Sequence, residues 1–344
     1  MNNLGVPSDM NLAVLGDYLT AEICGFGKIE SIRKFPGGQS NPTFVVDTNT
    51  GPFVLRRKPS GELLESAHAV DREFRVMKAL AHSDVPVPRM YHLCEDDSVV
   101  GSSFFVMEYI AGRHWWDQQL PRETNQLRSA VFDEQNRVLA ALHTIDVDVA
   151  GLGDYGPGSG YFARQVKRWT GQYRASATGY IDDIEQLIAW LGNNIPDDDG
   201  KLVLVHGDYR LDNMIFHPDR VEIIALLDWE LSTLGHPLAD LAYQCMQWRL
   251  PPGRLSRGLA GVDRASIGIP SEEEYVERYW ARRGISAVEG WTFALAFSFF
   301  RLAVIVQGVK KRAAIGNASS RQATELAKMV EPLVRMAVNL IEEE

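Results

Sequence analysis

The segment His206-Gly-Asp-Tyr-Arg-Leu-Asp-Asn213, followed by Asp228, is the feature that most constrains how this chain folds. Apolar runs at 202–205 and 221–227 lead into these two polar groups, so each group is expected to follow a buried strand. Two short strands would then bring three side chains to one point. The three are Asp208, Asn213 and Asp228.

Phosphoryl transfer from ATP explains why these residue types stand at this spacing. The reaction needs Mg²⁺ held against the phosphates and an acceptor hydroxyl held in line. Asp208 is predicted to accept the hydroxyl proton or to orient the hydroxyl, while Asn213 and Asp228 supply oxygen ligands to Mg²⁺. His206 is interpreted as structural, with ring nitrogens that fix the loop and the stretch around Asp228. The alternative is that these residues only cap helices and stabilise turns.

Upstream, the segment 35–44 places two glycines and small polar residues between apolar stretches. This pattern predicts a hairpin turn whose backbone N–H groups cover phosphates. An ordinary turn is the alternative, because the three-glycine G-x-G-x-x-G pattern is absent. The residues of the turn that we predict to contact nucleotide are Gly38, Gln39, Ser40 and Asn41.

The next strand, 52–58, alternates so that Val54 and Arg56 share one face. Val54 would then contact adenine and Arg56 would contact phosphate. A helical pattern follows at 70–80, and Glu73 beside its buried face is placed to pair with Arg56. A surface arginine is the alternative for Arg56.

The segment 103–112 is typical of a core strand that runs into a connector ending in glycine. The backbone of the connector is predicted to bond the purine, so the side chains there carry little information. A plain buried strand fits the pattern equally well. The predicted adenine-binding residues are Met107, Glu108, Tyr109 and Ile110.

Taken together, these segments resemble the aminoglycoside phosphotransferase and choline kinase superfamily, which has the protein-kinase fold, over about residues 30–310. Within it, the chain is most similar to the phosphotransferase domains found alone in bacteria or fused to acyl-CoA dehydrogenases. The most specific matching segments are His206-Gly-Asp208 with Asn213, Leu227-Asp-Trp-Glu230 and Gly235-His-Pro-Leu-Ala-Asp-Leu-Ala-Tyr243.

The resemblance implies a role for each matching residue. It implies Asp208 as the catalytic base, Asn213 and Asp228 as metal ligands, and Arg56 with Glu73 as the ion pair that positions phosphate. It also implies residues 107–110 as the adenine hinge, and ATP and Mg²⁺ as cofactors. Asp240 is expected to brace the catalytic loop.

The chain departs from its relatives at two places. Arg56 stands where many relatives have lysine, and a planar guanidinium is not equivalent to a compact ammonium. Asp228-Trp-Glu230 replaces the Asp-Phe-Gly of protein kinases, and no activation loop or Ala-Pro-Glu segment follows. Regulation by loop phosphorylation is therefore not expected.

The expected fold is α+β and two-lobed, like a protein kinase, with a small antiparallel-sheet N-lobe that contains one helix and a larger, mainly helical C-lobe. The predicted boundaries are 1–107 for the nucleotide-binding lobe, 108–112 for the hinge and 113–344 for the catalytic and substrate-binding lobe. Long helical patterns lie at 130–143, 164–173, 181–191, 271–283 and 321–342.

Composition excludes several classes of function. The net charge of −10 argues against a nucleic-acid partner. Three separated cysteines and the lack of an N-terminal secretory signal indicate a reducing cytoplasm. The apolar stretch 291–309 is interrupted by Arg301, so it is interpreted as a core helix and no membrane partner is expected.

The acceptor is predicted to be a small molecule with a hydroxyl group, and a hydroxyacyl-CoA is the favoured candidate by resemblance. Basic residues gather in a loop at 247–264 and in a cluster at 310–312. If either faces the acceptor, it would favour an anionic one. The alternative is that both form a solvated charged surface. The alternatives are an aminoglycoside phosphotransferase, a protein kinase and a catalytically silent nucleotide-binding module. No pattern in the sequence specifies the oligomeric state.

Overall fold

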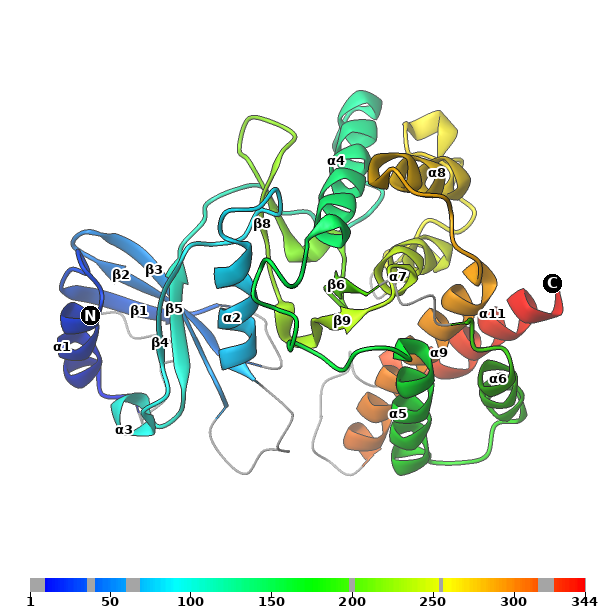
Figure 1. The fold of residues 1–344 in the computed structure, drawn as a ribbon, viewed down its shortest axis with the longest axis horizontal. Helices are drawn as coiled ribbons and strands as arrows, with labels where there is room; N and C mark the ends of the chain where they lie inside the picture. The colour runs from blue at the N-terminus through cyan, green and yellow to red at the C-terminus, as the bar shows by residue number, and fades with distance from the viewer. Residues whose placement is uncertain are drawn as a thin grey trace. The chain divides into compact units, whose positions relative to one another are not determined.

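In the computed structural model, the described residues are 10–35, 41–59, 69–197, 202–253, 256–314 and 325–343. The chain forms two compact units, and each is assembled from separate segments (Figure 1). The first unit consists of residues up to His114, Asp148–Leu152 and Asp212–Ser232. The second unit consists of Trp115–Val147, Gly153–Leu211 and the chain from Thr233 onward. The segment with Asn213 and Asp228 therefore belongs to the first unit.

The first unit is built around a five-stranded antiparallel sheet in the order β1-β2-β3-β5-β4. β2 and β3 form a hairpin in which Thr48 pairs with Gly51, whose φ of 130° favours glycine. The strands are β1 (Ile29–Lys34), β2 (Thr43–Thr48), β3 (Gly51–Arg57), β4 (Met90–Cys94) and β5 (Phe104–Glu108).

Helices α1 (Leu12–Glu22) and α2 (Val70–Leu80) cover opposite faces of this sheet (Figure 1). Phe104 shares one buried apolar cluster with α1, whereas the Phe105 ring lies 6.3 Å from the Phe74 ring of α2. Because neighbouring residues of a strand point to opposite faces, the two helices must lie on different sides.

The expectation of one helix in this part of the chain is wrong. α1 precedes the sheet, and a single turn, α3 (Asp97–Val100), lies between β4 and β5. α1 buries only Leu15 and Leu19, so its apolar periodicity is weak. Asn11 nevertheless marks its start, because its side chain accepts hydrogen bonds from the backbone N–H groups of Ala13 and Val14.

The remaining elements of the first unit flank two of the predicted site residues, Asn213 directly before β7 and Asp228 between β8 and η2. They are β7 (Met214–Phe216), β8 (Ile223–Leu226) and the 3₁₀ turn η2 (Trp229–Leu231). Gly112 lies against this hairpin, and a Cβ there would be 2.3 Å from the carbonyl oxygen of Phe216. The glycine that ends the predicted connector is therefore required by this close approach.

The second unit is mainly helical, with a two-stranded sheet of β6 (Val203–Val205) and β9 (Thr233–Gly235). The 3₁₀ turn η1 (Leu211–Asn213) joins the second unit to the first, and η3 (Ala265–Ile267) precedes α8. The helices are α4 (Asn125–Thr144), α5 (Tyr161–Ser176), α6 (Asp182–Asn193), α7 (Leu238–Arg249), α8 (Glu272–Arg283), α9 (Trp291–Ala314) and α11 (Val330–Glu342).

The expected core helix is present as α9, which packs against α5, α7 and α11. By length and composition alone its residues 291–313 would be able to cross a membrane, but 72% of that apolar window is buried inside the fold. Phe293, Phe297, Phe300 and Val304 are all buried at helical spacing.

The other four helical patterns correspond to α4, α5, α6 and α8, with ends that differ by up to five residues. The C-terminal pattern corresponds to helical residues at 325–327 and to α11. A turn at 328–329 precedes α11, and residues 321–324 lie outside the described chain.

Candidate active site

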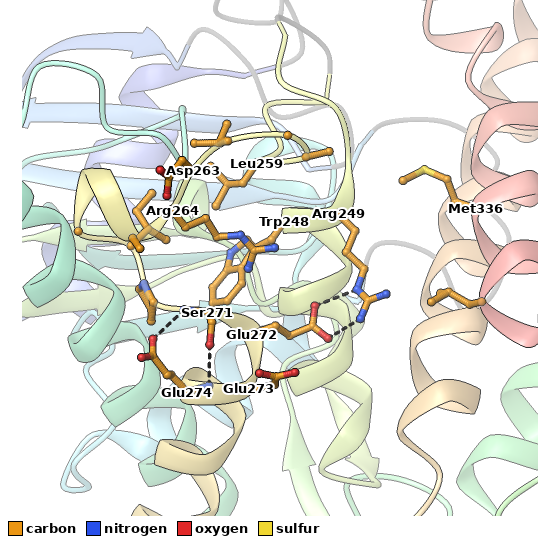
Figure 2. A pocket seen from close by; sticks show the side chains of 18 of the residues that line it. Trp248, Arg249, Leu259, Asp263, Arg264, Ser271, Glu272, Glu273, Glu274 and Met336 are labelled. Carbon is orange, nitrogen blue, oxygen red and sulfur yellow. Dashed lines mark hydrogen bonds and ion pairs between the residues drawn. The ribbon is translucent and has the colours of Figure 1, made fainter. Parts of the chain in front are cut away.

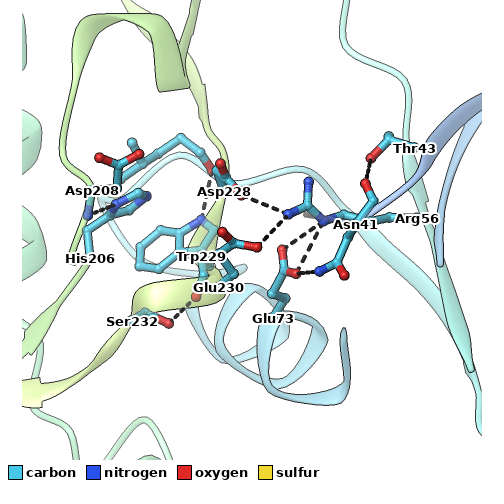
Figure 3. A network of polar contacts seen from close by, with 11 residues as sticks. Asn41, Thr43, Arg56, Glu73, His206, Asp208, Asp228, Trp229, Glu230 and Ser232 are labelled. Atoms are coloured by element: carbon cyan, nitrogen blue, oxygen red, sulfur yellow. Dashed lines mark hydrogen bonds and ion pairs between the residues drawn. The ribbon is translucent and has the colours of Figure 1, made fainter. Parts of the chain in front are cut away.

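Arg56 in β3 is the centre of a polar network in the first unit (Figure 3). Its Nε lies 3.1 Å from Oε2 of Glu73 in α2, and its Nη2 lies 2.7 Å from Oδ1 of Asp228. Oε2 of Glu230 lies 3.7 Å from the same Nη2. The pairing of Arg56 with Glu73 that the sequence suggests is present, and a planar guanidinium reaches carboxylates in several directions at once.

Glu73 is held in this network by burial and by two donors. Its side chain is 1% exposed, and Nδ2 of Asn41 donates to its Oε1 at 2.8 Å. Burial raises the pKa of Glu73 to about 7 and outweighs the lowering by Arg56. Burial lowers the pKa of Arg56, but the neighbouring carboxylates together raise it by more, so this side chain stays charged.

Asn213 and Asp228 lie at the same end of the β7–β8 hairpin. Met214 pairs with Leu226, and the backbone N–H of Leu227 donates to the carbonyl oxygen of Asn213 at 2.8 Å. Asp228 has a left-handed backbone, with φ 68° and ψ 61°. Such a conformation costs a residue with a Cβ about 1–3 kcal/mol, although aspartate tolerates it better than most, and it is typical of functional sites.

The oxygen atoms of this hairpin end suit Mg²⁺. A carboxylate and a carboxamide are hard ligands, and Mg²⁺ is commonly bound by one or two carboxylates together with substrate phosphates. Within the described ranges, no group of three or more His, Cys, Asp or Glu side chains would hold a metal by itself. Asn213 and Asp228 would supply two ligands to such an ion, and phosphate oxygens would complete its coordination.

Asp208, the predicted base, lies in the loop after β6 and belongs to the second unit. Its Oδ1 accepts a hydrogen bond from the Tyr243 hydroxyl at 2.9 Å and lies 3.3 Å from Nε of Arg210. Burial raises the pKa of Asp208, but Arg210, Arg301 and the Tyr243 hydrogen bond lower it below its usual value. The carboxylate is therefore ionised at neutral pH, as a proton acceptor must be.

Asp240 braces the loop that carries Asp208, as the sequence predicts. Its two oxygens accept the backbone N–H groups of His206, at 2.6 Å, and Gly207, at 2.8 Å. Gly207 has a φ of 84°, which favours glycine in this turn. Nδ1 of His206 accepts the backbone N–H of Asp208 at 3.2 Å, so its ring fixes the loop.

Asp240 is supported in turn by a buried histidine. Nε2 of His143 lies 3.2 Å from Oδ2 of Asp240, and Nδ1 of His143 lies 2.6 Å from the Tyr279 hydroxyl. Burial lowers the pKa of His143. Burial also raises the pKa of Asp240, but the hydrogen bonds from His143 and the loop backbone lower it more, so the pKa of Asp240 is below its usual value. Asp240 therefore presents a carboxylate to the loop.

The predicted adenine-binding residues lie in and after β5. Met107 pairs with Val54 of β3, and both side chains are buried. The backbone N–H of Glu108 donates to the carbonyl oxygen of Arg89, while Tyr109 and Ile110 follow the strand and are partly buried. Of the predicted phosphate-covering turn, Gly38, Gln39 and Ser40 lie outside the described residues. The nucleotide contacts of all these residues stay predictions.

The model of the phosphotransferase enzyme family matches residues 31–294 of this sequence. This chain belongs to that family. A protein from Ralstonia eutropha described as a candidate aminoglycoside phosphotransferase is 46% identical to this phosphotransferase, with a TM-score of 0.89 over 97% of this chain and 98% of that one.

Curated relatives of this phosphotransferase carry the matching region within longer chains. Acyl-CoA dehydrogenase family member 10 of Mus musculus is 44% identical over 97% of this chain and 32% of its own length. Acyl-CoA dehydrogenase family member 11 of Homo sapiens is 42% identical over 94% of this chain and 42% of its own length. The chain thus spans about a third to two fifths of these relatives.

Distant solved structures confirm the predicted kinase-like α+β fold of the phosphotransferase. One is a spectinomycin phosphotransferase in complex with ADP and spectinomycin. It is 14% identical, with a TM-score of 0.63 over 95% of this chain and 97% of its own.

The second unit also contains a cavity of about 1160 Å³ at the C-terminal end of α7 (Figure 2). Trp248, Arg264 and Met336 are among the side chains that line it, and its described lining includes none of the predicted site residues. Arg249 of this wall forms two hydrogen bonds with Glu272, so its charge is neutralised.

The arginine-rich loop is thus partly engaged inside the second unit. Besides the pair of Arg249 with Glu272, the Arg257 guanidinium lies 5.0 Å from the Trp116 ring centre. The Arg264 guanidinium lies 5.6 Å from that of Trp248. Arg254 lies outside the described residues. These contacts engage part of the loop within the second unit, and its orientation towards an acceptor stays a prediction.

The sequence did not predict that four residues take part in the networks around Arg56 and Asp208. Glu230 and Arg210 stand within the recognised motifs, but nothing in the pattern shows that they contact Arg56 and Asp208. Tyr243 closes the third motif, and Arg301 was considered only as a charge in an apolar helix. Their contacts depend on tertiary structure.

Proposed function

We propose that this protein is an ATP- and Mg²⁺-dependent phosphotransferase that moves the γ-phosphoryl group to a hydroxyl of a small molecule. The observation that carries the proposal is the Arg56 network, in which one strand cation contacts both the helix carboxylate Glu73 and the hairpin-end carboxylate Asp228. That arrangement, on a chain of the phosphotransferase family, combines a phosphate-binding cation with a metal-binding carboxylate.

The residues have distinct roles in this proposal. Asp208 accepts the proton of the acceptor hydroxyl, and its lowered pKa keeps it ready to do so. Arg56, oriented by Glu73, binds phosphate oxygens. Asn213 and Asp228 would hold Mg²⁺, which would neutralise phosphate charge. Val54 and residues 107–110 receive the adenine.

A hydroxyacyl-CoA is the acceptor that we favour. The support is the identity of 44% and 42% with chains named as acyl-CoA dehydrogenase family members. An aminoglycoside is the second candidate, favoured by the Ralstonia eutropha protein at 46% identity. The kinase-type chemistry is the same for both acceptors, and only the molecule that presents the hydroxyl differs.

The test is a screen of ATP consumption across hydroxyacyl-CoAs, aminoglycosides, amino alcohols and sugars, with products identified by mass spectrometry. We expect a phosphorylated hydroxyacyl-CoA from the wild type and none from Asp208→Ala. Phosphate on aminoglycoside hydroxyls, and on no thioester, would overturn the acceptor assignment. If the wild type binds Mg-ATP and turns over no acceptor, the silent nucleotide-binding alternative is correct.

A further inference from the structure

Tyr243, in the middle of α7, is joined to the predicted base by its hydroxyl group. The Tyr243 hydroxyl donates to Oδ1 of Asp208 at 2.9 Å, and the tyrosine is only 4% exposed. Burial and the neighbouring carboxylate raise the pKa of this hydroxyl well above its usual value, so it stays protonated and remains a donor. The contact lies entirely within the second unit.

The Tyr243 ring is itself held by a buried cation. The Arg301 guanidinium of α9 lies 5.1 Å from the Tyr243 ring centre and 5.4 Å from that of Trp169 in α5. Nη2 of the same arginine donates to the carbonyl oxygen of Gly207, in the loop that carries Asp208. Arg301 is 6% exposed, so these contacts are made away from water and are stronger than at a surface.

We propose that Tyr243 is a positioning residue for phosphoryl transfer, which fixes the Asp208 carboxylate through its hydroxyl while Arg301, which also lies over Trp169, fixes its ring. This inference rests on the proposed function, because it gives Asp208 the role of the base. Helices α5, α7 and α9 are thereby linked to one oxygen of that base. A displacement of about 1 Å at a reacting group is enough to lower a rate about 100-fold, so such a link has a measurable effect.

The groups that face Asp208 allow the hydroxyl to be tested separately. They are Arg210 on the same loop, His206 before it, Arg301 from α9 and Tyr243 from α7. Tyr243→Phe keeps the ring that stacks on Arg301 and removes only the donor. The Asp208 carboxylate then loses one stabilising hydrogen bond, while its charged neighbours remain.

A matched control is available in the same unit. Tyr275 of α8 is 1% exposed, and its hydroxyl has no hydrogen-bond partner among the described residues. Tyr275→Phe therefore removes the same atom from an equally buried tyrosine that does not touch Asp208.

The experiment compares kcat, KM and the pH profile of the wild type, Tyr243→Phe and Tyr275→Phe with the acceptor found in the screen. For Tyr243→Phe we expect kcat to fall about tenfold, KM for ATP to stay within about twofold, and the acidic limb of the profile to move to higher pH. Tyr275→Phe should match the wild type. An unchanged kcat and profile for Tyr243→Phe, or an equal loss in the control, would refute the positioning role.

A second readout does not depend on catalysis. The side-chain carboxyl of Asp208 is followed by carbon-13 NMR of the full chain, assigned with Asp208→Asn, and we expect it to titrate at higher pH in Tyr243→Phe. An unmoved titration refutes the link between the residues even where no acceptor is found. Activity that survives in Asp208→Asn would instead refute the proposed function. Arg301→Lys should also lower kcat, because an ammonium does not stack between two rings. An unchanged kcat in this variant would show that Arg301 does not help to position Tyr243.

Discussion

The networks around Arg56 and around Asp208 have opposite charge patterns. In the first unit one guanidinium contacts three carboxylates, those of Glu73, Asp228 and Glu230. In the second unit one carboxylate is influenced by two guanidiniums, those of Arg210 and Arg301, and accepts a neutral hydroxyl donor.

This difference in charge determines which species each network favours. Around Arg56 three carboxylates face one cation, so negative charge is in excess and a further cation is favoured, while burial raises the pKa of Glu73. Around Asp208 positive charge is in excess, which keeps the carboxylate ionised in spite of burial. The first network therefore suits a bound cation, whereas the second keeps Asp208 as a carboxylate that is able to accept a proton.

Replacement of the central carboxylate is expected to have the largest effect on this comparison. Asp208→Asn keeps the shape of the side chain but removes its ability to accept a proton, so kcat should fall about 10³-fold or more. The affinity for Mg-ATP, measured by calorimetry, should change little. A variant with more than about a tenth of the wild-type kcat would show that Asp208 is not the base.

Loss of the central cation should come next. Arg56→Met leaves the buried Glu73 without its ion-pair partner, and the free energy of unfolding in urea should fall by about 3–5 kcal/mol. Arg220→Met is the matched control in the same unit. This variant breaks the ion pair of Arg220 with Glu222, in which the two side chains are 64% and 47% exposed. Its free energy of unfolding should therefore fall by less than about 1 kcal/mol. Equal losses would mean that the Arg56 network contributes no special stability.

A smaller effect is expected where the second network is attached to the fold. Asp240→Asn offers one oxygen in place of two to the backbone N–H groups of His206 and Gly207, so one of them loses its acceptor. The free energy of unfolding should fall by about 1–3 kcal/mol, and kcat should fall with it. Asp133→Asn, at a carboxylate that is 42% exposed, serves as the control and should leave kcat unchanged.

The most gradual effect is a dependence of stability on pH. Because the folded-state pKa of Glu73 is raised from 4.5 to about 7, the unfolded chain releases this proton at lower pH than the folded chain does. The contribution of Glu73 is therefore present in full below about pH 4.5 and is lost as pH rises towards 7, with a slope of at most about 1.4 kcal/mol per pH unit.

Glu73→Gln, which does not titrate, is the reference for this measurement. The stability of the wild type relative to Glu73→Gln, measured in urea, should decline as pH rises through that window. A flat or rising difference would show that the ion pair with Arg56, and not burial, controls this carboxyl group.

The sequence predicted those parts of the site that are coded locally. Strand ends and motif spacing placed Asp208, Asn213 and Asp228 in loops after buried strands, and the alternation around Arg56 gave its pairing with Glu73. The bracing by Asp240 came from the family resemblance and is present in the backbone hydrogen bonds of the loop. The convergence of Asp208 with the two metal ligands stays a prediction.

Contacts that depend on packing were beyond the reach of the sequence. Tyr243 is separated from Asp208 by 35 residues, and Arg301 lies 94 residues from Gly207, so no periodicity connects them. Likewise, Glu272 neutralises Arg249 in a loop that is rich in arginine, and the sequence pattern did not predict this ion pair. α1 escaped detection because only two of its residues are buried.

The split composition of the first unit has a consequence for biosynthesis. Arg56 and Glu73 leave the ribosome long before Asp228, and the hairpin that carries this aspartate is translated after much of the second unit. A nascent chain that ends near His114 would present Arg56 with only part of its acidic partners. The sheet itself ends at Glu108, but the Arg56 network is completed only after Asp228 and Glu230 have emerged, so a fragment cut at the connector would lack two of the three carboxylates around Arg56.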